Sequence, residues 1–159
     1  MQATLVPERR EEVTTEGGLA TGSPEARGLL ADALERLRGA GTRTSLFIDP
    51  EPEVVRISAD LGADAVELHT GEYANTRGPE REEQLERVRR TAALAGSLGL
   101  AVHAGLGLTY QNVAPLAAIP EIEELNIGHS VVSHAVFVGM ERAVREMAEL
   151  IRRGRGEVR

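Results

Sequence analysis

Residues able to take part in acid–base chemistry or in anion binding stand directly after the short apolar runs of this chain. Asp49, His69 and His103 each follow such a run, and a further run ends at Gly128 and His129. In α/β barrels the carboxyl ends of parallel strands form the face that carries the chemistry. The spacing therefore predicts a polar site at one end of a parallel sheet.

Glu67 is the carboxylate most suited to a role in that site. Strand alternation places Val66 and Leu68 on one face, and Ala65, Glu67 and His69 on the other. If the face with the small residues points into a barrel, Glu67 lies in a packed interior, where an unpaired charge is unfavourable. Either Glu67 is functional, or it forms a structural ion pair with an inward arginine.

The histidines divide into two groups. His69 and His103 share the predicted inward register, and a histidine there can act as an acid, a base or a hydrogen-bond donor to phosphate. A hydrogen-bonded histidine with a purely structural role fits the same positions equally well. His134 falls within a predicted helix and is expected to be structural or exposed.

Two glycine stretches suggest a phosphate site. Gly105-Leu106-Gly107 follows the fourth apolar run, and Gly128-His129 follows the fifth, just before a short predicted helix. Barrels often hold phosphate with the loops after their last two strands and the N-terminus of an extra helix. Glycine also simply permits tight turns, so each stretch alone is a weak signal.

Strand-like and helix-like segments alternate along the chain, which is typical of βαβ units and a parallel sheet. Ser23 and Pro24 mark one helix start by a capping residue and a proline. We predict an α/β fold, a single domain over residues 1–159 that forms a partial TIM-type barrel of about five strands. The predicted strands cover 3–6, 42–48, 64–69, 100–104 and 124–127, and the predicted helices cover 24–38, 53–61, 79–98, 111–118, 130–138 and 140–153, with a loop between Gly71 and Gly78.

The composition of the 159-residue chain argues against several classes of function. A net charge of −7 and only 3% aromatic residues argue against nucleic-acid binding. No apolar run approaches the roughly 20 residues of a membrane span, so we expect a cytoplasmic protein that binds no membrane. Cysteine and lysine are both absent, which excludes a thiol nucleophile and a Schiff-base lysine.

The amino-acid sequences of several segments closely resemble those of the pyridoxine 5′-phosphate synthase family. The resemblance covers nearly the whole chain in order. It is carried by Leu5–Gly18, Ser45–Asp49, Val66–Gly71, Tyr73-Ala74, Gly107–Tyr110, Asn112-Val113, Ala118–Glu121 and Glu124–His129.

The resemblance implies a (β/α)8 barrel, usually octameric, that acts in vitamin B6 biosynthesis. Its substrates are 3-amino-1-hydroxyacetone 1-phosphate and 1-deoxy-D-xylulose 5-phosphate, and its products are pyridoxine 5′-phosphate, inorganic phosphate and water. It implies no organic cofactor and no metal. By the same resemblance, Thr14 binds substrate, Glu67 stabilises the transition state, and Gly107, Gly128 and His129 bind phosphate.

Two departures from the family pattern change the expectation for this chain. The family has three further strands before the segment that matches residue 1, and these carry catalytic residues. The family also has a proton-donor histidine where this chain has Leu106. We therefore expect two edge strands, an open apolar inner face, and association with further copies or with an N-terminal barrel half. The alternative is a catalytically silent subunit, derived from the enzyme, that binds a phosphate ligand or serves assembly.

Overall fold

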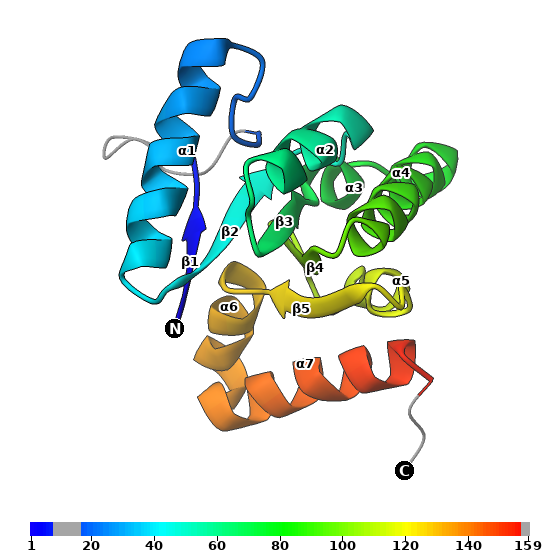
Figure 1. The fold of residues 1–159 in the computed structure, drawn as a ribbon. Helices are drawn as coiled ribbons and strands as arrows, with labels where there is room; N and C mark the ends of the chain where they lie inside the picture. The colour runs from blue at the N-terminus through cyan, green and yellow to red at the C-terminus, as the bar shows by residue number, and fades with distance from the viewer. Residues whose placement is uncertain (8–16, 157–159) are drawn as a thin grey trace.

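In a computed structural model, which describes residues 1–7 and 17–156, the chain forms one five-stranded parallel sheet. The strands lie side by side in chain order (Figure 1). Their bounds are β1 (Gln2–Leu5), β2 (Arg43–Ile48), β3 (Ala65–His69), β4 (Ala101–Gly105) and β5 (Ile122–Asn126). The predicted α/β class and the number of strands are thus confirmed.

Helices follow each strand, and of the seven helices in the described residues six were predicted from the sequence. Their bounds are α1 (Pro24–Gly39), α2 (Pro52–Asp60), α3 (Gly71–Asn75), α4 (Gly78–Ser97), α5 (Val113–Ala117), α6 (His129–Val138) and α7 (Met140–Gly154). The predicted start of α1 is confirmed, because Ser23 Oγ accepts a hydrogen bond from the Ala26 backbone N–H at 3.1 Å.

The loop predicted between Gly71 and Gly78 is wrong in its first half, which forms α3. The helix is held by a tertiary contact that glycine content could not reveal. Tyr73 is buried, and its hydroxyl donates to the Asn112 carbonyl at 2.7 Å. Asn112 lies 39 residues away from Tyr73 along the chain, so the local helix propensity of this segment could not predict the contact.

The sequential strand order indicates barrel-type winding. Parallel crossovers are almost always right-handed, so strands added in one direction carry their helices on the same face. Leu46, Ile48, Val66 and Leu68 lie in the main core with side chains of α1, α2 and α4. Figure 1 shows these helices along the outside of the strands. The architecture is therefore a curved, singly wound sheet, consistent with a partial TIM-type barrel.

The opposite face of the sheet is polar, which corrects the expected open apolar face. Cα pairing places Phe47 beside Glu67 and Glu67 beside His103, and His103 pairs in turn with Glu124. Ser45, Phe47, Glu67 and His103 are all buried. Most apolar residues of these strands alternate onto the helix-covered face, and apart from Phe47 mainly polar or small residues are left on the inner face.

β1 and β5 form the two edges of the sheet within the described residues. Beyond β5, the helices α5, α6 and α7 pack around a second core that contains Val113, Val131, Ala143 and Met147. No helix in the described ranges is both long and apolar enough to cross a membrane.

Candidate functional site

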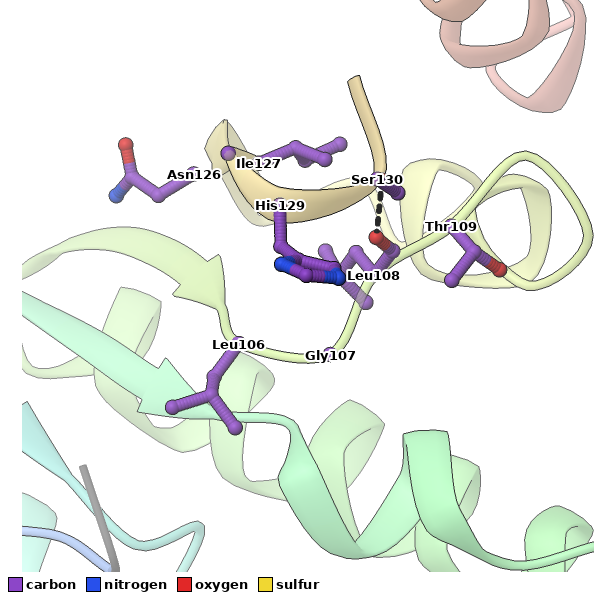
Figure 2. Close-up of a pocket in the computed structure, with 9 residues that line it drawn as sticks. Leu106, Gly107, Leu108, Thr109, Asn126, Ile127, His129 and Ser130 are labelled. Carbon is purple, nitrogen blue, oxygen red and sulfur yellow. Dashed lines mark hydrogen bonds between the residues drawn. The ribbon is translucent and has the colours of Figure 1, made fainter. Parts of the chain in front are cut away.

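The two glycine segments that the sequence singled out meet in one pocket of about 390 Å³ (Figure 2). One wall is the loop after β4, and the other is the connection from β5 into α6. Ser130 Oγ donates to the Leu108 carbonyl at 2.7 Å and so ties the two walls together. The lining residues are Leu106, Gly107, Leu108, Thr109, Asn126, Ile127, Gly128, His129 and Ser130.

The loop after β4 requires glycine at position 107. Gly107 has a φ of 76°, and a Cβ there would lie 2.5 Å from Ala74 Cβ. Asn112 fixes the loop from below, since its Oδ1 accepts from the Thr109 N–H at 2.7 Å and its Nδ2 donates to the Gly107 carbonyl at 3.1 Å. The backbone at Gly107 is therefore exposed but rigidly placed.

The second wall presents the start of α6. Gly128 is the N-cap residue and has no side chain that would occupy the first N–H groups of the helix. Those N–H groups lack partners within a helix, and the helix dipole makes the terminus favourable for an anion. Figure 2 shows His129 extending from this terminus toward the loop after β4. Gly107, Gly128 and His129 are thus brought together as the sequence predicted, whereas Thr14 lies outside the described residues.

Glu67 lies on the inner face, one strand away from the pocket, with 8% of its surface exposed. Burial raises the pKa of the Glu67 carboxyl, while a hydrogen bond from the Asn126 side chain and the nearby His103 oppose the rise. No arginine in the described part of the chain contributes to this environment, which speaks against the structural ion pair that the sequence left open.

Bare backbone at Gly105 makes room for the contact between Glu67 and Asn126. A Cβ at this position would overlap Glu67 Oε1 and would lie 3.1 Å from Asn126 Cβ. Asn126 itself lines the pocket. It therefore connects the buried carboxyl to the anion-binding loops. Asn126 was not among the predicted site residues, although its position at the end of β5, in register with Gly105, was the signal.

His69 in β3 and His103 in β4 occupy different settings. His69 Nδ1 lies 3.2 Å from Asp49 Oδ1, and its ring packs edge-on against Phe47 at 5.3 Å between centroids. His103 is buried beside Glu67, with its Nδ1 3.4 Å from Gln2 Nε2.

His134 has a structural role, as the sequence predicted. Its Nε2 lies 2.7 Å from Glu146 Oε2, and its ring contacts Tyr110 at 4.8 Å between centroids, which joins α6 to α7. Across residues 1–7 and 17–156, no group of three or more acidic, histidine or cysteine side chains could hold a metal ion.

Comparison with known proteins gives one consistent family. The model of the family described as pyridoxal phosphate biosynthesis protein PdxJ matches residues 1–153. A pyridoxine 5′-phosphate synthase of Sulfurihydrogenibium is 51% identical over 97% of this chain and 63% of the relative. Proteins of the same name from Rhodopirellula baltica and Akkermansia muciniphila are 52% and 53% identical over 94% of this chain, and each alignment spans 60% of the relative. The chain thus spans less than two thirds of the length of these curated relatives.

Proposed function

Because the chain belongs to the family of the pyridoxal phosphate biosynthesis protein PdxJ, we propose that it acts in vitamin B6 biosynthesis as the phosphate-binding part of a pyridoxine 5′-phosphate synthase. The reaction condenses 3-amino-1-hydroxyacetone 1-phosphate with 1-deoxy-D-xylulose 5-phosphate. It yields pyridoxine 5′-phosphate, inorganic phosphate and water. We place this function in the cytoplasm.

The observation that carries the proposal is the convergence of two glycine loops beside a buried carboxyl. The phosphate of a substrate binds the exposed backbone at Gly107 and the N–H groups that begin α6. His129 adds a ring N–H donor from the same helix end. Backbone donors of this kind hold an anion without the lysine that the chain lacks.

Glu67 supplies the acid–base or electrostatic part of the proposed mechanism. Its raised pKa means that it keeps its proton to a higher pH than an ordinary carboxyl, which suits a group near developing charge. Asn126, which lines the pocket, hydrogen-bonds the Glu67 side chain from the neighbouring part of the inner face. Thr14 completes the proposed substrate contacts on the evidence of the family resemblance alone.

A binding titration tests the phosphate site directly. We expect inorganic phosphate and 1-deoxy-D-xylulose 5-phosphate to shift the backbone amide signals of Gly107 and Ser130 in NMR spectra. His129→Ala should weaken phosphate binding about 10-fold or more, the effect of one lost charge-assisted hydrogen bond. Ser133→Ala, an exposed change on the same helix, is the matched control. Unshifted amides at millimolar phosphate would refute the site.

Condensation is tested separately by the formation of pyridoxine 5′-phosphate from the two substrates. Glu67→Gln should abolish turnover and leave phosphate binding within about twofold, because Glu67 does not line the phosphate pocket. If Glu67→Gln and the unchanged protein turn over the substrates equally fast, Glu67 has no part in the mechanism.

One observation favours a second function, a catalytically silent subunit that binds a phosphate ligand. Leu106 lines the pocket, and an aliphatic side chain transfers no proton. Phosphate binding without any product, even when further barrel strands are supplied, would select this alternative over the enzyme.

We also propose that the functional form contains more protein than this sheet alone. An eight-stranded barrel has further strands between β5 and β1, and the relatives are longer than this chain. These strands come either from an N-terminal barrel half or from other copies in a homo-oligomer. The exposed apolar side chains of α6 and α7 support such association, above all Phe137 with 86% of its surface exposed.

A further inference from the structure

Asp49 and His69 form a hydrogen-bonded pair across the ends of β2 and β3. Asp49 Oδ1 lies 3.2 Å from His69 Nδ1 and also accepts from the Gly18 N–H at 3.0 Å. An ionised carboxylate only accepts hydrogen bonds, so His69 Nδ1 carries the proton. In the neutral ring, Nε2 is then a hydrogen-bond acceptor.

That acceptor is buried and has no hydrogen-bond partner among the residues that the structure describes. A Cβ built on Gly71 would lie 2.7 Å from His69 Nε2 and 3.1 Å from Leu106 Cδ2. The acceptor and the leucine side chain therefore both lie beside the bare backbone of Gly71. A buried acceptor left without a donor is unfavourable, so its retention requires a reason.

The backbone at Leu106 is held in a conformation that leucine does not favour. Its φ is 86°, the only positive value at a non-glycine residue in the described ranges. Thr70 fixes this conformation from the end of β3. Its hydroxyl lies 2.7 Å from the carbonyl oxygens of both Gly105 and Leu106, and its N–H donates to the Gly105 carbonyl.

The direction of the side chain follows from this backbone. Figure 2 shows Leu106 pointing away from His129 and toward the neighbouring strand end. That strand end carries His69. Leu106, a strained residue that lines the anion pocket, is thus directed toward the strand end that carries His69 Nε2, the acceptor unpartnered within the described residues.

We propose that the Asp49–His69 pair is a hydrogen-bond relay that presents an acceptor to the side chain at position 106. His69 is a positioning residue in this relay, because it acts through residue 106 and does not line the pocket. A side chain with an N–H at position 106 would donate to His69 Nε2 and be oriented by it. Leu106 has no such donor, so in this chain the relay consists of Asp49 and His69 alone. The catalytic use of the relay rests on the proposed function, but the hydrogen bond itself requires no substrate.

The test compares Leu106→Gln, which adds an N–H donor, with Leu106→Met, which keeps an apolar side chain of similar volume. Nitrogen NMR of the imidazole rings should first show the Nδ1–H tautomer of His69 in the unchanged protein. In Leu106→Gln, the Nε2 signal should move in the direction of a hydrogen-bonded acceptor, and in Leu106→Met it should stay.

Stability gives a second and independent measurement. The unfolding equilibrium constant of Leu106→Gln should be about fivefold smaller than that of Leu106→Met, the effect of one net hydrogen bond. The difference should disappear when both changes are made in a His69→Phe background.

An Nε2–H tautomer in the unchanged protein would overturn the relay. So would equal unfolding constants for the two variants together with an unmoved Nε2 signal. A loss of phosphate binding alone would count against the proposed function and leave the relay standing, which keeps the two failures distinguishable.

Discussion

Replacing Gly105 with alanine is expected to destabilise the protein at the contact between β4 and Glu67. The new Cβ would overlap Glu67 Oε1 and lie 3.1 Å from Asn126 Cβ and 3.2 Å from the Asn126 carbonyl oxygen. The backbone oxygen cannot move without disturbing β5, so the Glu67 side chain must leave its position. This loses a hydrogen bond to a charged group, about 1.5–3 kcal/mol, and adds overpacking of about 1–3 kcal/mol.

The expected net loss in the free energy of unfolding is about 1.5–5.5 kcal/mol, since alanine recovers about 0.5–1 kcal/mol by restricting the unfolded chain. Urea denaturation followed by circular dichroism measures it. Gly28→Ala is the matched control, because Gly28 lies inside α1 and a Cβ added there would meet no atom within 4 Å. That change should stabilise the protein by about 0.5–1 kcal/mol.

A double-mutant cycle identifies the source of the loss at Gly105. With Glu67→Ala already in place, Gly105→Ala should be at least about 1 kcal/mol less destabilising than in the unchanged protein, because the overlapping carboxylate is gone. If Gly105→Ala proves as stable as the unchanged protein, or if its full effect persists without Glu67, overlap with the carboxylate is not what glycine avoids here.

Three further outcomes are expected. Burial raises the pKa of Glu67 above its ordinary value of 4.5, so its contribution to stability falls as the pH rises through the folded-state pKa. Glu67→Gln should accordingly be more stable than the unchanged protein at about pH 7 and lose that advantage below the ordinary value of 4.5, as thermal unfolding across pH will show. The pKa of Asp64 is lowered from 3.8, chiefly by the backbone N–H and then the hydroxyl of Thr44, so its contribution is present above 3.8 and lost as the pH falls through the folded-state pKa. Asp64→Asn should lower the free energy of unfolding by about 1–2 kcal/mol at about pH 7 and have little effect in acid; a pH-independent difference would contradict this cause. Finally, Phe137→Ser should weaken self-association at least about tenfold in light scattering, since a buried aromatic ring contributes about 1.5–3 kcal/mol; unchanged association would exclude this face.

Much of the fold was predictable because its signals are local. Ser23-Pro24 marks the start of α1, and glycines mark the ends of helices, so element boundaries came out close to those observed. Three elements were shifted or missed: β5 and α5 each begin two residues from the predicted start, and α3 was not predicted. β5 begins at Ile122, two residues before the predicted strand, next to a register shift at Val102 and His103. α3 depends on the hydrogen bond from Tyr73 to Asn112.

The candidate site was predictable in part for the same reason. Gly107, Gly128 and His129 were recognisable because backbone exposure requires glycine and because a helix begins at residue 129. Asn126 and Asp49 were not assigned a role, because their partners Glu67 and His69 are distant in sequence. The role of each of these residues in catalysis remains a prediction.

By itself the sequence determined the alternation of strands and helices, the polar ends of the strands and the absence of lysine and cysteine chemistry, since these depend on residue type and spacing. Only the tertiary structure decided which polar residues meet. Parallel pairing sets Glu67 beside His103, the bare backbone of Gly105 lets Asn126 reach that carboxyl, and the bare backbone of Gly71 leaves room beside it for both His69 and Leu106. Such contacts join residues tens of positions apart, and the distances between them are set by the register in which whole strands pair.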